Sequence, residues 1–245
     1  MARKDAGDQG QTADAIVGPF RVTLATSDAD RTDEYRLRYE VFVEECRFLS
    51  GEGCVGRQER DEFDEGSCAF LLRDAESGEI AACQRLILPD RLPAGTITNF
   101  EREYQPLASG PHLDLATAPR GTWAEVSRTT VAPKYRWGGS AAALPAIVVM
   151  KYASIALSIA FGRSALFSLS EPAIVRLIRR LGFEMVQVGA LVEFHGRRAP
   201  FRMDVDDIVR SVRDNDRPWL DRLIHAALRL PGTTRRPGSG PARVA

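Results

Sequence analysis

The sequence has few of the residues that build metal and redox sites, and it carries no net charge. Its four cysteines stand at positions 46, 54, 68 and 83, and no two of them form a CxxC pair. That spacing argues against a zinc site, so we expect no bound metal and four reduced thiols. The 33 basic residues balance the 33 acidic residues. No overall field therefore attracts nucleic acid, although arginine-rich patches can act locally.

Two further features are missing: an apolar leader and an uninterrupted run of membrane length. Residues 1–15 are polar and do not look like a secretory signal, so we expect a cytoplasmic protein. The longest apolar run, residues 141–161, contains Pro145 and Lys151. This pattern favours a buried helix over a membrane span, while peripheral contact with a membrane stays allowed.

The composition divides the chain into one domain with polar ends. Residues 1–18 and 231–245 are polar or rich in Gly, Pro and Arg, which predicts disordered tails. Between them, residues 19–204 are long enough for one sizeable core. Residues 205–230 read as a helical extension.

Strand and helix patterns alternate along the central domain. A helix is expected between Ser170, which would cap its N-terminus, and Gly182, which would end it. The full pattern predicts a mixed α/β sheet covered by helices. Strands are expected at 20–26, 68–74, 80–89, 122–132, 164–170, 184–194 and 200–204, and helices at 30–49, 141–161, 171–181 and within 205–229.

Three arginines fall inside apolar patterns. Arg38 lies beside the apolar stripe of the first helix, Arg85 lies in a strand, and Arg128 interrupts another strand. A charged group in such a place is costly unless it is paired. We therefore predict a partly buried network with three carboxylates, the alternative being a solvated acidic loop and arginines that reach solvent. The expected partners are Asp61, Asp64 and Glu125.

Strand geometry sets a condition on this network. Regular alternation places Glu125 and Arg128 on opposite faces of their strand, because they are three residues apart. The two side chains can share a cleft only if the strand is bulged or splayed between them.

A glycine-containing turn precedes the apolar helix. Gly138 and Gly139 allow close approach of the backbone, and Ser140 and Ala141 open the helix, where free N–H groups suit phosphate oxygens. Arg136 begins the same loop. We predict a phosphate-binding loop here, the alternative being an ordinary strand–helix turn.

The segments LRYEVFVEE, DEFD, QRLILP and AEVSR, in this order, resemble the acyl-homoserine-lactone (autoinducer) synthases, which have a GNAT-like fold. The loop from Arg136 also fits the pyrophosphate-loop pattern of GNAT enzymes. Phe48 stands where the synthases usually have tryptophan, which implies a different acceptor pocket. The resemblance covers Arg38, Phe42, Asp61, Asp64, Arg85, Phe100, Glu125 and Arg128.

The wider chain, over roughly residues 20–210, is more similar to a neighbouring group. YRLRYEVFVEECRFL, SEPAIVRLIRRLGF and GALVEFHGRRAPF resemble the PEP-CTERM/exosortase system-associated acyltransferases and related N-acyl amino acid synthases. The resemblance implies an α/β GNAT fold with a mixed, mostly antiparallel central sheet flanked by helices. It implies no permanently bound cofactor, an acyl-phosphopantetheine donor (acyl carrier protein or acyl-CoA) and a small amine acceptor, often an amino acid.

The resemblance also implies roles in acyl transfer. Glu125 is the first choice for the base that takes the amine proton, with Asp61 or Asp64 as alternatives. Strand N–H groups from Ser127 to Val131, a stretch that includes Thr129, are expected to stabilise the oxyanion. The three arginines would hold the carboxylates, and one of them would bind an acceptor carboxylate. Phe42, Phe48 and Phe100 would line the acceptor or acyl cleft.

Two other functions stay open: a lactone synthase that uses S-adenosylmethionine, and a non-catalytic module that binds an acyl ligand. The histidines at 112 and 195 lie near no GxSxG motif, which disfavours covalent hydrolase chemistry. Basic residues could dock an acidic carrier protein. The candidates are Arg176, Arg179, Arg180, Arg197 and Arg198.

Overall fold

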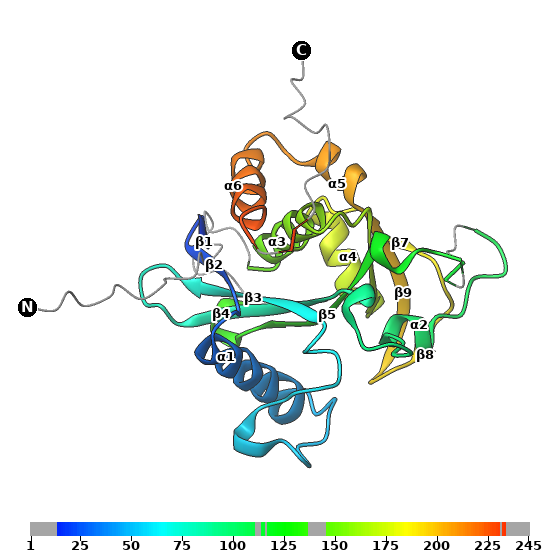
Figure 1. The fold of residues 1–245 in the computed structure, drawn as a ribbon, viewed down its shortest axis with the longest axis horizontal. Helices are drawn as coiled ribbons and strands as arrows, with labels where there is room; N and C mark the ends of the chain where they lie inside the picture. Colours follow the sequence, from blue (N-terminus) through cyan, green and yellow to red (C-terminus); the bar gives the residue numbers. More distant parts are fainter. Residues whose placement is uncertain (1–13, 111–113, 116, 137–145, 231, 234–245) are drawn as a thin grey trace, which may run out of the picture.

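The described residues form one sheet with helices on both of its faces (Figure 1). The strand order is β1-β2-β3-β4-β5-β6-β9-β7, and β8 pairs with β9. Of the described strands, only β5 and β6 pair in parallel. The predicted mixed, mostly antiparallel sheet is thereby confirmed. The computed structural model describes residues 14–110, 114–115, 117–136, 146–230 and 232–233.

The elements follow the expected alternation closely. The strands are β1 (Asp14–Val17), β2 (Phe20–Leu24), β3 (Ser67–Asp74), β4 (Ile80–Ile87), β5 (Trp123–Val131), β6 (Ala165–Ser170), β7 (Val186–Gln187), β8 (Val192–Glu193) and β9 (Arg197–Asp204). The α-helices are α1 (Asp28–Arg38), α2 (Asn99–Glu103), α3 (Ala146–Ala160), α4 (Pro172–Arg180), α5 (Val205–Ser211) and α6 (Arg217–Ala227). A π-helix, η1 (Tyr39–Glu45), continues α1, and short 3-10 turns are η2 (Val55–Arg57), η3 (Pro89–Arg91), η4 (Arg120–Thr122) and η5 (Pro133–Tyr135).

The two faces of the sheet carry different helices. Helix α3 crosses β3, β4 and β5 on one face, with α6 packed beside it, and α1 covers the same strands on the opposite face (Figure 1). Strand β4 is buried on both sides, which explains its nearly continuous apolar sequence. The larger core lies under α3, and within the described residues no helix has the length and apolarity needed to cross a bilayer.

Strands β5 and β6 run together only at their starts. Their pairing extends from Trp123↔Ala165 to Glu125↔Phe167, and both strands continue beyond it. One edge of β5 is therefore not paired with β6 after Glu125.

A β-bulge interrupts the pairing of β4 with β5. Cys83 pairs with Thr130 but Arg85 pairs with Ser127, so one β4 residue faces two residues of β5. Arg128 lies in the bulge and has a φ of 48°. A non-glycine residue in this left-handed region costs about 1–3 kcal/mol, and such strain is found mostly at functional sites. The bulge meets the condition that the sequence set for Glu125 and Arg128.

The sequence predicted a single α-helix over residues 30–49. The structure instead divides this segment into the α-helix α1 and the π-helix η1. Helix α1 begins after Ser27, whose side chain accepts a hydrogen bond from the N–H of Asp30. After Arg38 the chain widens into the π-helix η1, and the N–H of Cys46 bonds the carbonyl oxygen of Val41 at 2.9 Å. Hydrogen bonds to the fifth residue back are rare and are frequently found at functional sites.

Two smaller predictions are wrong. Residues 14–17 are not part of a disordered tail, because they pair with β2 and bury Ala15 and Val17. Ser170 does not cap α4: Glu171 holds the N-cap position, and the Ser170 hydroxyl contacts Ser168 at 3.0 Å. The predicted C-terminal helical extension is present as two helices, α5 and α6, and α6 packs on α3.

Candidate active site

A buried ion-pair network lies on the face of the sheet that α1 covers. Arg38 comes from the end of α1 and Arg85 from β4, and both side chains are 0% exposed. Their shared partner is Asp64, which accepts from Nη1 of Arg38 at 2.6 Å and from Nη1 of Arg85 at 2.6 Å. The predicted pairing of buried arginines with this acidic loop is therefore present.

Asp61 and Glu59 complete the network on the side of β5. Asp61 accepts from both terminal nitrogens of Arg85, with Nη2 at 2.8 Å. Glu59 accepts from Nε of Arg38 at 2.6 Å and from Nε and Nη2 of Arg128 at 3.1 and 3.0 Å. Charge-assisted bonds of this kind are strong and fix the loop against the sheet.

Two members of this network, Glu34 and Glu59, were not predicted from the sequence. Glu34 lies four residues before Arg38 on α1 and bonds its Nη1 at 2.9 Å. Glu59 lies two residues before Asp61 in the same acidic segment. The helical four-residue spacing and the acidic run were signals that could have identified both.

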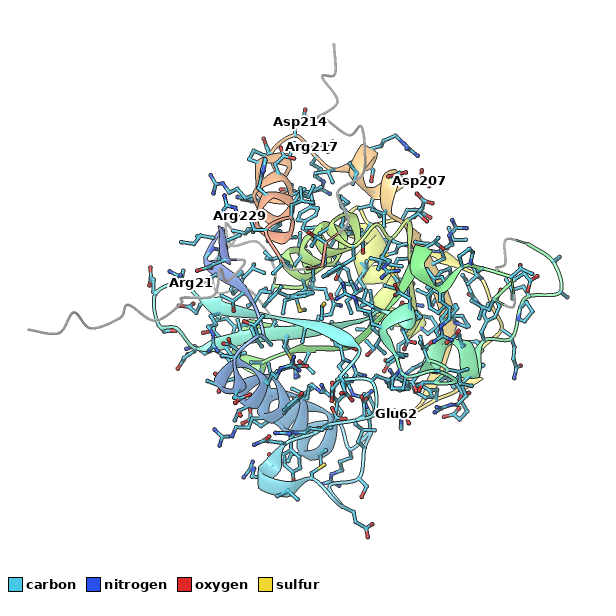
Figure 2. The ribbon with its side chains drawn as sticks, viewed as in Figure 1. Arg21, Glu62, Asp207, Asp214, Arg217 and Arg229 are labelled. Atoms are coloured by element: carbon cyan, nitrogen blue, oxygen red, sulfur yellow. The ribbon has the colours of Figure 1, made fainter. Side chains whose placement is uncertain are left out.

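Figure 2 shows where the acidic loop turns to solvent. Glu62 is labelled at the surface, and its side chain is 61% exposed. It pairs with Arg102 of α2 at 3.3 Å. The loop thus directs Asp61 and Asp64 inward and Glu62 outward, and it connects the α1 side of the site to α2.

Glu125 is not an ion-pair partner in this network, contrary to the prediction. It lies on the same face of the sheet as Arg85, since Ile87 is its β4 partner. Its Oε2 accepts a hydrogen bond from the N–H of Phe100 at 2.9 Å, and the side chain of Thr98 bonds it too. The first residues of α2, rather than an arginine, hold this carboxylate.

The surroundings of Glu125 favour its protonated form. Glu125 is 2% exposed and adjoins an aromatic cluster that includes Phe100, Trp123 and Phe167. Burial raises its pKa, and the two hydrogen bonds and the charges of Arg85 and Arg128 oppose this only in part. A carboxylate with a raised pKa is the stronger proton acceptor when ionised.

The remaining predicted substrate residues are divided between the two faces. Ser127 lies on the network face, where its hydroxyl accepts from Nε of Arg85 at 3.1 Å. Thr129 lies on the opposite face, because its hydroxyl bonds Gln84, which in turn bonds Ser154 of α3. Phe42 on η1 lies under the guanidinium of Arg128, 5.6 Å from its ring centre. Phe100 is fully buried.

Phe48 contacts the start of β9. The guanidinium of Arg198 lies 5.1 Å from its ring centre, and the His195 ring hydrogen-bonds the backbone of Phe48. Chain segments that are far apart in sequence thus meet beside Arg128. No local pattern in the sequence predicts this contact.

The predicted phosphate loop is described only at its first residue. Gly138, Gly139, Ser140 and Ala141 lie outside the described residues. Arg136 pairs with Glu45 of η1, with Nη2 and Oε2 at 2.6 Å, and its Nε donates to the carbonyl oxygen of Val131 at 3.0 Å. A phosphate would therefore compete with Glu45 for this guanidinium.

The network predicts a loss of stability in acid. The guanidinium groups of Arg85 and Arg128 outweigh burial and lower the pKa of Asp61 from 3.8 to about 2. A carboxylate with a lowered pKa stabilises the fold above its unfolded pKa, and this contribution is lost as pH falls through its folded pKa. We expect the free energy of unfolding, measured by urea denaturation, to fall by about 2 kcal/mol for Asp61 alone between pH 4 and pH 2.

Glu59 and Asp64 also have lowered pKa values and act in the same direction. Burial raises the pKa of Glu34 and Glu125 above 4.5. These two groups therefore affect the free energy of unfolding above about pH 4.5 rather than between pH 4 and pH 2. A free energy of unfolding that stays level from pH 4 to pH 2 would contradict the ionised network.

Comparisons with known proteins agree on the fold. The sequence matches the acetyltransferase (GNAT) domain family over residues 37–146, and no curated protein matches it. Among solved structures, TofI in a ternary complex with an inhibitor and MTA is 25% identical, with a TM-score of 0.56 over 75% of this chain and 91% of its own.

Two structures with lower sequence identity share the same fold. The acyl-homoserine-lactone synthase LasI is 14% identical, with a TM-score of 0.56 over 77% of this chain and 91% of its own. FeeM, an N-acyl amino acid synthase from uncultured soil microbes, is 12% identical, with a TM-score of 0.54 over 78% and 93%. None of these comparisons bears on the exosortase association, which stays a prediction. The chain therefore shares the fold of these structures, a mixed, mostly antiparallel sheet flanked by helices, and its residues 37–146 match the GNAT domain family.

Proposed function

We propose that this protein is an N-acyltransferase that moves a fatty acyl group from a phosphopantetheine thioester to the amine of a small acceptor, preferably an amino acid. The observation that carries the proposal is the place of Glu125. Its buried carboxylate, whose pKa is raised, lies at the last pair between β5 and β6, where the edge of β5 becomes free of β6.

Glu125 is the base in this mechanism. The neutral amine attacks the thioester carbon, a C–N bond forms, and the C–S bond breaks to release the thiol of the phosphopantetheine. The amine proton passes to Glu125, directly or through water, and the leaving sulfur takes up a proton. Asp61 suits this task less well, because its pKa of about 2 makes it a weak proton acceptor.

The oxyanion would lie along the edge of β5 beyond Glu125. Backbone N–H groups there are held by the sheet and need no rearrangement during the reaction. The bulge at Arg128 changes the direction of the chain within this segment. Arg38 and Arg85 are engaged with protein carboxylates, so we assign them the task of holding the acidic loop in place.

The exposed face of α4 supports an acyl carrier protein as the donor. Arg176 and Arg180 are exposed, four residues apart, next to the exposed apolar side chains of Ile174 and Leu177. An acidic helix with a few apolar residues would complement such a face. Arg179 does not belong to it, because its guanidinium bonds the carbonyl oxygen of Met185.

The choice of donor predicts a salt effect. We expect turnover with acyl carrier protein to fall at least tenfold between low and physiological ionic strength, because salt screens attraction between opposite surfaces beyond about 8–10 Å. Turnover with the matched acyl-CoA should change less. Double replacement of Arg176 and Arg180 by glutamine should remove most of the salt effect. Better use of acyl-CoA with little salt dependence would assign CoA as the donor and leave the transferase proposal intact.

A lactone synthase that uses S-adenosylmethionine is the second candidate. The likeness to TofI, whose structure contains MTA, and to BjaI, a CoA-dependent synthase solved with SAM, favours it. Mass spectrometry of lipid extracts from cells that express the chain separates the candidates. The proposal predicts a new N-acyl amino acid, the second candidate predicts an acyl-homoserine lactone, and the absence of any new acylated amine would contradict both.

A further inference from the structure

Arg198 is a partly buried arginine whose ion pair with Glu171 is long. It is the second residue of β9, and 17% of its side chain is exposed. Its nearest carboxylate, Glu171, lies 3.6 Å from Nη2, which is beyond hydrogen-bond range. Its Nε is buried and bonds no atom of the described residues. Nη2 donates a hydrogen bond to the backbone oxygen of His195 at 3.3 Å.

The surroundings of Arg198 differ from those of the network arginines. Carboxylates raise the pKa of Arg38 and Arg85. Burial lowers the pKa of Arg198; the charge of Glu171 opposes this, and the nearby charge of Arg128 adds a smaller lowering effect. Burial and the charges of Arg128 and Arg198 also lower the pKa of His195. Arg198 is therefore desolvated as the network arginines are, but only one long ion pair, to Glu171, offsets this.

The position of Arg198 connects it to the proposed reaction. Its guanidinium lies over Phe48, while that of Arg128 lies over Phe42, so two cations and two aromatic rings border one region next to the bulge. Arg128 is already bonded to Glu59 through Nε and Nη2. Of these two arginines, Arg198 has the unbonded Nε and is therefore the better placed to bind an anion.

We propose that Arg198 binds the carboxylate of the acceptor, and that Phe48 and Phe42 contact the acceptor beside it. The inference rests on the proposed function and narrows its acceptor to an amine that also carries a carboxylate, as in an amino acid. Bound in this way, the carboxylate replaces the distant Glu171 as counter-ion and gives the guanidinium the hydrogen bonds that it lacks. The acceptor amine then points toward β5 and Glu125.

The same contact favours an open-chain product. A carboxylate that is held by two hydrogen bonds to a guanidinium is a weaker nucleophile than a free one. Closing a lactone ring also needs a leaving group on the acceptor, and an amino acid without one keeps its carboxylate in the product. This separates the inference from the lactone synthase, in which the acceptor cyclises.

The test compares each of the twenty common amino acids with its own primary amide as acceptor, with one acyl donor at saturation. For the amino acid that reacts best, we expect wild-type kcat/KM to exceed that of its amide by about tenfold or more, the scale of a charged hydrogen bond. In Arg198→Gln, the KM of the amino acid should rise by a similar factor. The KM of the amide and the KM of the donor should stay within about threefold.

Two further variants show whether the effect is specific. Arg198→Lys retains the charge without the fork of donors and should lose less than the glutamine variant. Arg210→Gln, on α5 and 70% exposed, makes the same change of charge far from the site and should match wild type. Equal use of acid and amide by the wild-type protein, or an equal loss with both in Arg198→Gln, would overturn the inference and leave acyl transfer standing. Transfer to no amine at all would overturn the proposed function as well.

Discussion

Replacing Glu125 with glutamine is expected to lower the turnover of acyl transfer by about 100-fold or more, the usual scale for the loss of a general base. Glutamine has nearly the same shape, and its amide oxygen can still accept the N–H of Phe100 that Glu125 now accepts at 2.9 Å. The fold should therefore survive. The measurement is the initial rate of product formation, with urea denaturation of the same preparation as a check on folding.

The matched control is Glu62→Gln, which makes the same chemical change at an exposed position of the neighbouring acidic loop. It should leave turnover within about threefold of wild type. Unchanged turnover in folded Glu125→Gln would remove Glu125 as the base and leave Asp61 or Asp64. Their arginine partners and lowered pKa values make that outcome chemically unfavourable.

Replacing Arg85 with alanine is expected to destabilise the protein by about 3–5 kcal/mol as well as to abolish activity. The side chain is fully buried and bonds Asp61, Asp64 and Ser127. Its removal leaves two partly buried carboxylates with fewer donors and opens a cavity under α1. The free energy of unfolding from urea denaturation measures this effect.

An exposed ion pair supplies the comparison. Arg102→Ala removes an arginine that is 48% exposed and pairs with exposed Glu62, so it should cost less than about 1 kcal/mol. If Arg85→Ala unfolds at the same urea concentration as Arg102→Ala, the network does not hold the acidic loop. If Arg85→Ala proves too unstable to purify, Arg85→Lys retains one charge and should give an intermediate loss.

The sheet and most of the network were predictable from the sequence for a physical reason. A buried arginine is costly unless it is paired, so Arg38 and Arg85 in apolar patterns required carboxylates, and Asp61 and Asp64 lie in the one acidic run nearby. The partner assigned to Glu125 was wrong. Charge pattern alone could not reveal that the N–H of Phe100 and the side chain of Thr98 stabilise this carboxylate in place of an arginine.

Features that depend on tertiary contacts were beyond prediction. The bulge at Arg128 appears in the sequence only as a mismatch of alternation, and it takes the register with β4 to locate it. The π-helix η1 has the same apolar spacing as an α-helix, so the two could not be distinguished. The contact of Phe48 with Arg198 joins segments 150 residues apart and has no local signature.

The most direct test of the central claim is a single assay with purified components. An acyl-phosphopantetheine donor is mixed with the protein and an amino acid mixture, and released thiol and N-acylated product are measured together. We expect one thiol for each N-acyl amino acid formed with the wild-type chain, and a rate that is lower by a factor of about 100 or more with Glu125→Gln. Thiol release without any N-acyl product, or equal rates for the two proteins, would contradict it.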